Sequence, residues 1–371
     1  MSISNKISLS ESYTFIRTRK KIENRAVLAA MTNKQSHDNG VISNNEIDWL
    51  FERAKGGFSV ITTAATNVSK EAKAWNGEFG VYDDIHIPGL RKLTSSIHST
   101  NSIVFAQLFH GGLKSPQSIT GKIPISASEI ECDGSNTGKS IEATIEDIDK
   151  IINDFTKAAI RCSESGFDGI ELHGAHGYLL SQFLGTKTNL RHDQWGGDIK
   201  ARSKLIVEIY KSIKNNVPES FIVGVRISPE IDSIGINLKD SIDLIAILKD
   251  LGFDFIHISC WDAFVPPVTY SDTKKTLTEI ITESYSDLPT IISTGGVWSG
   301  LHAQNLLNQG ADLVGVARVG IGHPDWAKMA CDIKYNPKKP PYSREYLKKM
   351  KLSNPFIDYM SLWKNFVTNK Q

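Results

Sequence analysis

Short aliphatic runs alternate with amphipathic segments along most of this chain, and that alternation constrains its fold more than any other feature. The runs lie at residues 26–31, 59–63, 103–108, 168–172, 221–227, 254–258, 290–293 and 312–316. Helical patterns follow most of them, at 46–55, 145–165, 201–215, 238–251 and 300–309. A repeated order of strand then helix predicts parallel strand pairing. Eight such strands are the number that closes a (β/α)8 TIM barrel, which is the predicted α/β fold.

Three junctions repeat the same step from helix to strand. They read Ser165-Gly166-Phe167-Asp168, Leu251-Gly252-Phe253-Asp254 and Gln309-Gly310-Ala311-Asp312. Glycine ends a helix well because it adopts positive φ angles without steric cost. The competing fold, an open doubly wound sheet, lacks its glycine-rich fingerprint after the first strand.

Length and composition fit one large domain. The chain has 371 residues, of which 40% are hydrophobic and 22% charged, and no linker divides it. We therefore expect a single domain over residues 1–371, with a C-terminal extension from about residue 330. Long loops are expected at 111–144, as a loop or hairpin after the third strand, and at 259–275 after the sixth.

Charge and cysteine usage exclude several classes of protein. The formal net charge is +1, which gives no field that would attract nucleic acid or an anionic membrane. The polar N-terminus lacks the apolar core of a signal peptide, and no stretch approaches the length of a membrane span. The four separated cysteines argue against a disulfide framework, an iron–sulfur site or a structural zinc site. We expect a cytoplasmic protein. The sequence does not decide whether it forms a homo-oligomer.

The hexapeptide from His173 to Tyr178 follows the fourth run directly. In a parallel α/β fold, chemistry gathers at the carboxyl ends of strands. His173 and His176 can converge on one oxygen, and Tyr178 can approach it from another side. The same spacing also suits a metal site, and a strand-end histidine is often structural. These six residues alone leave catalysis, metal binding and structure open.

Two late glycine-rich turns predict a phosphate site. Gly295 and Gly296 follow the seventh run, and Ala317 and Arg318 follow the eighth. In an eight-stranded barrel these two loops commonly cradle a phosphate, with backbone N–H groups and an arginine. The alternatives are a plain turn and a surface arginine.

With these motifs in place, the chain resembles the old yellow enzyme family of flavin mononucleotide (FMN)-dependent oxidoreductases from about Asn24 to about Lys328. The agreement lies in the order and spacing of segments 24–32, 56–66, 106–110, 173–178, 225–228, 293–296 and 317–318. No single segment is specific for the family, whereas all of them together in this order are.

The resemblance implies an FMN site. Ala29, Ala30, Met31 and Thr32 match the segment along the flavin ring, with Thr32 near its C4 carbonyl and N5. Ala65 matches a close-packing position beside the ring. Gln107 is similar to the amide at the pyrimidine edge, and Arg226 to the arginine near N1, where the reduced flavin gathers negative charge. Gly295, Gly296, Ala317 and Arg318 match the phosphate site.

The resemblance also assigns catalytic and substrate-binding roles. His173 and His176 look like the pair that holds the substrate carbonyl oxygen, and that binds the nicotinamide carboxamide in turn. Tyr178 looks like the proton donor to the α-carbon. No metal is implied.

Three departures from the family pattern limit these implications. Ala317 stands where a glycine is more usual, and it keeps its N–H donor if its φ is negative. Thr32 replaces a redox-tuning cysteine of some relatives. The iron–sulfur cysteines and second nucleotide domain of larger relatives are not expected.

The resulting interpretation is an ene-reductase. NADH or NADPH reduces FMN, and the hydride then passes to the activated C=C bond of an α,β-unsaturated carbonyl or nitro compound in a ping-pong cycle. A His-x-x-His metal-dependent barrel hydrolase and a non-catalytic flavin-binding protein are the alternatives. The sequence leaves open the physiological substrate, the choice between NADH and NADPH, and the roles of Trp75, Phe109 and Trp261.

Overall fold

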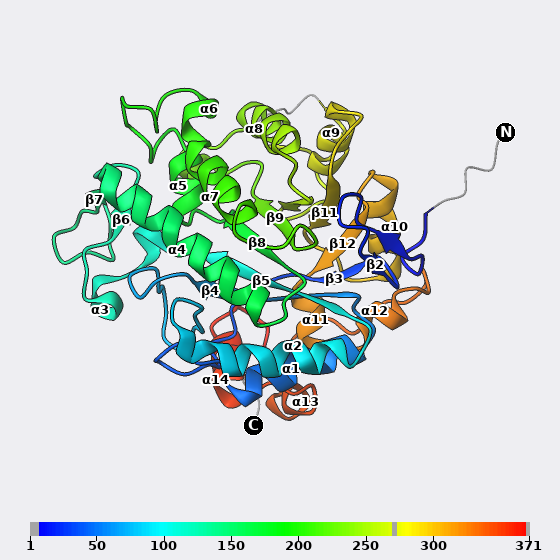
Figure 1. The fold of residues 1–371 in the computed structure, drawn as a ribbon. Helices are drawn as coiled ribbons and strands as arrows, with labels where there is room; N and C mark the ends of the chain where they lie inside the picture. Colours follow the sequence, from blue (N-terminus) through cyan, green and yellow to red (C-terminus); the bar gives the residue numbers. More distant parts are fainter. Residues whose placement is uncertain (1–6, 269–272, 369–371) are drawn as a thin grey trace.

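The computed structural model describes residues 7–268 and 273–368, and within them eight parallel strands form one closed barrel (Figure 1). Around the barrel the spatial order is β10-β11-β12-β3-β4-β5-β8-β9. The strands are β3 (Ala26–Leu28), β4 (Val60–Asn67), β5 (Ile103–Phe109), β8 (Gly169–Gly174), β9 (Ile222–Ile227), β10 (Phe255–Ser259), β11 (Thr290–Thr294) and β12 (Leu313–Val316). The predicted TIM barrel is therefore confirmed, and each predicted run overlaps one strand.

Two strand boundaries differ from the sequence expectation. β3 stops at Leu28 instead of residue 31, although Ala29 N–H still donates to the carbonyl of Val316 on β12. β4 continues to Asn67, past the predicted end at residue 63, and its register with β5 shifts between Thr62 and Ala65. That irregularity is a bulge, which aliphatic patterning does not reveal.

Helices cover the outside of the barrel. They are α1 (Asn44–Lys55), α2 (Ile87–His98), α4 (Ile145–Glu164), α5 (Leu179–Leu184), α6 (Ile199–Arg202), α7 (Lys204–Lys214), α8 (Leu238–Leu251), α9 (Leu277–Ser284), α10 (Gly300–Asn308) and α11 (Arg318–Gly322), with short 3-10 turns η1 (Asp84–His86) and η3 (Asp232–Ile234). Side-chain caps start several of them: Thr144 accepts from Asp147 N–H at the start of α4, and Asn237 accepts from Asp240 N–H at α8. The α8 helix ends at Gly252, whose φ is +89°, as the repeated junctions predict.

The predicted helix at 201–215 is wrong in one respect, because it is broken at Ser203 into α6 and α7. Arg202 lies next to the break. Its side chain is buried and bonds to the carbonyl of Leu184 and to Asp240. The inward orientation of this charged side chain depends on partners that are distant in sequence, which a local helical pattern does not reveal.

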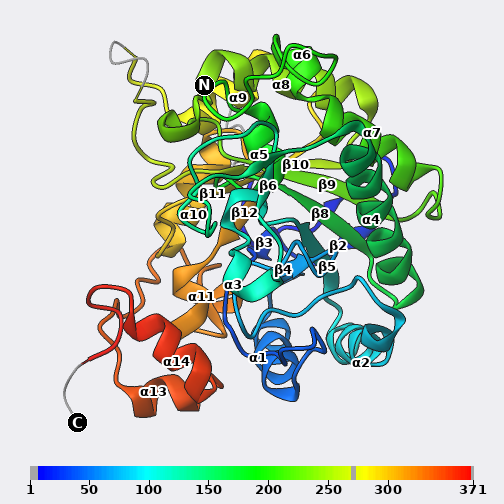
Figure 2. The same ribbon diagram turned by 90° about the vertical axis from the view of Figure 1, so that its left-hand side faces the viewer.

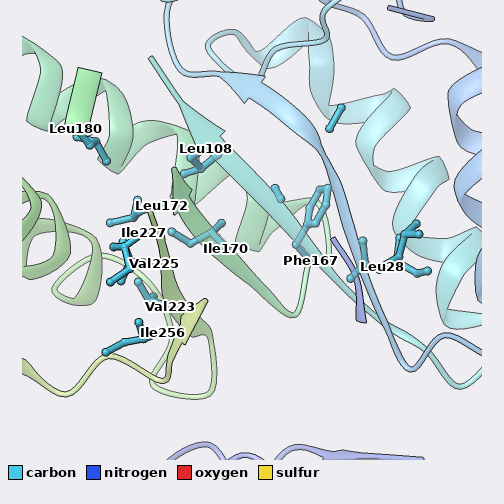
Figure 3. Close-up of a cluster of buried hydrophobic side chains, with 14 of the residues drawn as sticks. Leu28, Leu108, Phe167, Ile170, Leu172, Leu180, Val223, Val225, Ile227 and Ile256 are labelled. Atoms are coloured by element: carbon cyan, nitrogen blue, oxygen red, sulfur yellow. The ribbon is translucent and has the colours of Figure 1, made fainter. Parts of the chain in front are cut away.

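The main hydrophobic core lies between the strands and the helices. Along β9, Val223, Val225 and Ile227 belong to this core together with Ile170 and Leu172 of β8 (Figure 3). The alternate residues of β9, Gly224 and Arg226, lie on the opposite face, inside the barrel. The interior therefore has its own packing, separate from the helix layer.

An aromatic plug closes the barrel interior at the amino ends of the strands. The short antiparallel pair β1 (Tyr13–Thr14) and β2 (Lys21–Ile22) brings Phe15 to this end. Phe15 is fully buried and its ring lies 6.1 Å from that of Phe105. Phe105 in turn stacks on Phe255, with ring centroids 5.3 Å apart. Gly224 leaves room for this layer, because a Cβ there would lie 2.2 Å from the Phe255 ring.

The long segment between β5 and α4 is more ordered than a bare loop. It contains η2 (Gly112–Lys114), α3 (Gln117–Thr120), β6 (Ile125–Ser126) and β7 (Ile141–Glu142). β6 and β7 pair in parallel, so they are not the two arms of a hairpin. The second expected loop, 259–275, includes residues 269–272, which lie outside the described residues, as does the N-terminal segment 1–6.

The C-terminal segment packs against the barrel. It contains α12 (Trp326–Met329), α13 (Arg344–Lys349) and α14 (Asn354–Ser361), and the last two lie near α1 and α11 in both views (Figure 2). The ring of Phe356 lies 5.3 Å from that of Trp49 on α1.

Of the helices in the described segments, none is long and apolar enough to cross a membrane. The single-domain boundaries remain an expectation.

Replacing Phe15 with alanine should lower the free energy of unfolding by about 3–5 kcal/mol, the usual cost of emptying a buried phenylalanine site. Chemical denaturation measures this change. Ile16→Ala is the control, because Ile16 is 59% exposed beside it. Equal stabilities of the two variants would contradict the role of Phe15 as a plug.

Candidate active site

A cavity of about 330 Å³ opens at the carboxyl ends of the barrel strands. Thirteen of the fourteen residues that the sequence pointed to line it: Ala30, Met31, Thr32, Ala65, Gln107, His173, His176, Tyr178, Arg226, Gly295, Gly296, Ala317 and Arg318. The exception is Ala29, which is fully buried behind the lining. The volume is within the range of small-molecule and cofactor sites.

The turn after β8 brings the two histidines and the tyrosine together. His176 has a φ of +60° and Gly177 a φ of +72°, so two consecutive residues adopt the left-handed conformation that is uncommon for a side chain other than glycine. This turn reverses the chain before Tyr178, which precedes α5. Strain of this kind persists where the surrounding structure fixes it, often at functional sites.

The three rings form a close group. The ring centroids of His173 and His176 lie 5.0 Å apart, and those of His173 and Tyr178 lie 4.8 Å apart. His176 Nε2 lies 2.8 Å from the hydroxyl of Ser259. Ala175 N–H donates to His173 Nδ1 across a long 3.4 Å contact. With Nδ1 as acceptor, the proton of a neutral His173 is on Nε2.

Burial keeps all three groups uncharged at neutral pH. Burial lowers the pKa of His173 well below its usual range, and the neighbouring His176 and Arg226 lower it further. Burial followed by the charge of Arg226 lowers the pKa of His176 in the same way. Burial raises the pKa of Tyr178, with Glu78 and Tyr359 adding to the effect. The site therefore offers neutral N–H and O–H donors.

Aromatic side chains fix the position of Tyr178. Phe109 is fully buried and meets the Tyr178 ring edge-on at 4.9 Å, and Trp75 lies 6.4 Å from it. Lys114 Nζ lies 5.0 Å from the Tyr178 ring centre and donates to the carbonyl of His176. Phe109 and Trp75 are thus packing residues of the site. Trp261, in contrast, is 81% exposed at the cavity rim.

Two late loops form a second end of the cavity. Gly296 has a φ of +67°, and a Cβ on Gly295 would lie 2.7 Å from the carbonyl oxygen of Cys260. Ala317 has a φ of −118°, so the condition for its N–H donor is met. The guanidinium of Arg318 lies 5.7 Å from the Trp261 ring centre. It forms no ion pair within the described residues.

Arg226 projects from β9 into the cavity floor. Its guanidinium donates to the carbonyl of Ala30 at 3.3 Å and to the Ser259 hydroxyl at 3.1 Å. Its Nε is buried and has no hydrogen-bond partner among the described residues. Burial lowers the pKa of Arg226, an effect that the carboxylate of Glu171 opposes. A buried arginine with an unused donor beside a cavity is suited to an electron-rich ligand.

The sequence interpretation missed two groups of residues at this site. One lies inside the barrel: Glu171, His257, Ser259 and Thr294. Their inward positions on predicted strands were the available signal. The other is Tyr359, Met360 and Trp363, from α14 and the residues after it, which line the cavity from outside the barrel repeat. No local pattern connects that segment with the site.

A metal centre finds little support in this geometry. Within residues 7–268 and 273–368, no group of three or more His, Cys, Asp or Glu side chains is arranged to hold a metal ion. His176 instead bonds to Ser259, and His173 lies beside Arg226, a cation.

Comparisons with known proteins agree on one family. Residues 16–335 match the model of the NADH:flavin oxidoreductase / NADH oxidase family. The chain is 31% identical to the probable NADH-dependent flavin oxidoreductase YqiG of Bacillus subtilis (strain 168) over 324 residues, 86% of each chain. It is 33% identical to an NADPH dehydrogenase of Bacillus licheniformis over 83% of this chain and 90% of that one.

Other matches differ in length or show the fold alone. The chain is 32% identical to the NADH:acrylate oxidoreductase of Vibrio harveyi over 84% of its own length, but this covers only 32% of that protein. The solved old yellow enzyme homologue from Zymomonas mobilis superposes with a TM-score of 0.78 at 24% identity, covering 92% of this chain and 96% of that one.

The buried histidines should make the stability of the ligand-free protein depend on pH. Because their folded pKa values lie below the ordinary value of about 6.5, the unfolded chain binds more protons in that interval. Above about pH 6.5 both states leave these histidines neutral, and the free energy of unfolding has its full value. It decreases as the pH falls below about 6.5, because protonation then favours the unfolded chain. Thermal unfolding between about pH 8 and pH 5 measures the slope.

Replacing both His173 and His176 with asparagine should reduce that slope. The remainder comes from His86, His110 and His257, whose pKa values burial also lowers. His192→Asn, at an exposed position, is the control and should leave it unchanged. A double variant with the full wild-type slope would show that these two histidines titrate normally.

Proposed function

Because the chain belongs to the NADH:flavin oxidoreductase / NADH oxidase family, we propose that it reduces the activated C=C bond of α,β-unsaturated carbonyl or nitro compounds. Family membership agrees with the resemblance to old yellow enzymes, and it makes the protein an FMN-dependent oxidoreductase with NADH or NADPH as reductant. The metal-dependent hydrolase is thereby set aside. The observation that carries the proposal is the convergence of His173, His176 and Tyr178 over a cavity lined by Gln107 and Arg226.

The residues of the cavity fit a flavin mononucleotide. The free Nε of Arg226 supplies a buried donor, and Gln107 supplies an amide for a pyrimidine edge. Gly295 and Gly296 line the cavity with their backbone, and Arg318 adds a positive charge beside them. We therefore assign Gln107 and Arg226 to the ring, and Gly295, Gly296, Ala317 and Arg318 to the phosphate.

The remaining cofactor assignments concern the segment after β3. Ala30, Met31 and Thr32 line the cavity, and small side chains at Ala30 and Ala65 let a planar ring approach the backbone. Burial raises the pKa of Tyr359, and the neighbouring Thr32 opposes this effect. Ala29 acts indirectly, because it supports this segment from behind.

Held by Gln107, Arg226 and the two late loops, FMN would supply the hydride transfer from the nicotinamide to the β-carbon of the alkene. The protein then has to stabilise charge on the substrate oxygen. His173 and His176 are neutral donors on one side of the cavity, and their hydrogen bonds strengthen as that oxygen gains negative charge. Because one pair serves both substrates, nicotinamide and alkene must bind in turn, which is ping-pong behaviour.

Tyr178 is assigned as the proton donor to the α-carbon. Its raised pKa keeps the phenol protonated at neutral pH, and Phe109 and Trp75 hold the ring beside His173. A positioned acid of this kind contributes typically 10²–10⁴-fold to a rate. The name of the Vibrio harveyi relative, an NADH:acrylate oxidoreductase, supports an alkene beside an acyl group as the substrate class.

The proposal is tested directly by the purified protein. We expect a visible flavin spectrum, release of FMN on denaturation, and alkene-dependent oxidation of NADH or NADPH across a panel of enones, enals, maleimides and nitroalkenes. A protein that binds FMN but reduces no member of the panel would contradict the proposed substrate class.

Replacing Arg318 with alanine should weaken FMN binding by about 1.5–3 kcal/mol, the usual contribution of a charge-assisted hydrogen bond to an anion. Titration of the apoprotein with FMN, followed by fluorescence, gives the Kd. Arg91→Ala, at an exposed arginine on α2, is the control. An unchanged Kd in Arg318→Ala would place the phosphate elsewhere.

Replacing Tyr178 with phenylalanine should separate the two half-reactions. Reduction of the flavin by nicotinamide should stay near the wild-type rate, because the ring and both histidines remain. Enone reduction should fall by roughly 10²–10⁴-fold. Stopped-flow kinetics measures each half-reaction separately. Equal slowing of both would mean that Tyr178 positions the nicotinamide or supports the fold.

A further inference from the structure

A chain of buried hydrogen bonds runs beneath the cavity floor from β5 to β11. Gln107 Nε2 donates to Glu171 Oε1 at 2.6 Å. Glu171 Oε2 lies 2.6 Å from His257 Nδ1, and His257 Nε2 lies 2.6 Å from the hydroxyl of Thr294. Glu171 is 1% exposed and His257 is not exposed at all. Only the two ends, Gln107 and Thr294, line the cavity.

Each orientation in this chain follows from the charge of Glu171. Burial alone would raise the pKa of Glu171, but His257, Arg226 and Gln107 together lower it below its usual range. An ionised carboxylate only accepts hydrogen bonds. The amide nitrogen of Gln107 must therefore face it, and His257 must carry its proton on Nδ1. Burial lowers the pKa of His257, so its Nε2 accepts from Thr294.

The orientation of Gln107 is what this chain transmits to the cavity. Its nitrogen is held by Glu171, and within the described residues its amide oxygen has no protein partner. The pyrimidine edge of a flavin carries both N–H and carbonyl groups. Whether Gln107 presents an acceptor or a donor at a given point therefore decides between attraction and repulsion.

Glu171 also sets the electric field at the cavity floor. Its negative charge opposes the effect of burial on the pKa of Arg226, and His257 and Arg226 are register partners on the neighbouring strands β10 and β9. Below this layer lies the stacked pair Phe105 and Phe255, so no polar medium screens the two charges from that side. A negative charge here weakens the attraction of Arg226 for an electron-rich ligand.

We infer that Glu171 is a positioning residue for the flavin, which acts through Gln107 and Arg226 and is itself held by His257 and Thr294. The inference rests on the proposed function, since it takes FMN as the occupant of the cavity. It gives a role to Glu171 and His257, two buried residues that do not line the cavity.

The test uses Glu171→Gln in the FMN-loaded protein and in the apoprotein. A glutamine cannot accept from both Gln107 and His257, so FMN binding should weaken about tenfold, the usual effect of losing one hydrogen bond to a charged group. The flavin midpoint potential should become more positive, because a negative charge near the electron-accepting ring is removed. Titration with FMN and potentiometric titration measure the two effects.

Asp254→Asn is the matched control. Asp254 is also a buried carboxylate, but it directly precedes β10 at the amino end of the barrel, away from the cavity, and it pairs with Arg17. This variant should lose thermal stability and keep the wild-type FMN affinity and potential. Equal changes of affinity and potential in both variants would reduce Glu171 to a structural role and overturn the inference.

A second pair of variants acts through His257. His257→Asn keeps an N–H donor toward Glu171 and should bind FMN nearly as the wild type does. His257→Leu removes the donor and should bind FMN several-fold more weakly. If Glu171→Gln does not fold, this pair decides, and equal FMN affinities of the two His257 variants overturn the inference.

FMN binding by the wild type separates the proposed function from the role of Glu171. A wild-type protein that does not bind FMN contradicts the proposed function and the inference together. A wild type that binds FMN, with Glu171→Gln at the same affinity and the same potential, overturns only the inference.

Discussion

Closure of the parallel strands into a barrel is the constraint on which the rest of this structure depends. Inward side chains of β5, β8, β9 and β10 have no other place to go than a narrow interior. Near the amino ends that interior is filled by Phe105, Phe255 and Phe15. At the carboxyl ends it holds Gln107, Glu171, Arg226 and His257. Since water is excluded from below, these polar groups have to satisfy one another or a ligand.

The charges in that polar layer determine the protonation of the site above it. Arg226 and Glu171 are opposite charges in one buried layer. The nearby cation disfavours a second positive charge on His173 or His176, in addition to the effect of burial. Both imidazoles therefore remain neutral donors. The proposed stabilisation of a substrate oxygen depends on this electrostatic arrangement as much as on the spacing of the two histidines.

The cavity walls come from parts of the chain that are far apart in sequence. Trp261 belongs to the loop after β10, and Tyr359 and Trp363 belong to the C-terminal segment. Trp75, from the segment after β4, does not line the cavity but packs near Tyr178. Trp75 is packed among aromatic side chains, whereas Trp261 is 81% exposed. The mouth of the barrel is thus surrounded by a rim built from loops and from the C-terminal segment, and loops at this end of the fold commonly carry substrate contacts.

The sequence by itself determined the barrel, because alternating strand and helix patterns at eight places are a local signal that closure then uses. Its motifs also pointed to thirteen residues that now line one cavity, since parallel strands place their carboxyl ends at the same edge. Only the tertiary structure decided the break at Ser203, the parallel pairing of β6 with β7, and the position of Tyr359 beside Thr32. It also decided the partners of Glu171. Those features depend on contacts between residues distant in sequence, and burial, charge and hydrogen-bond geometry at such contacts leave no periodic pattern in the chain.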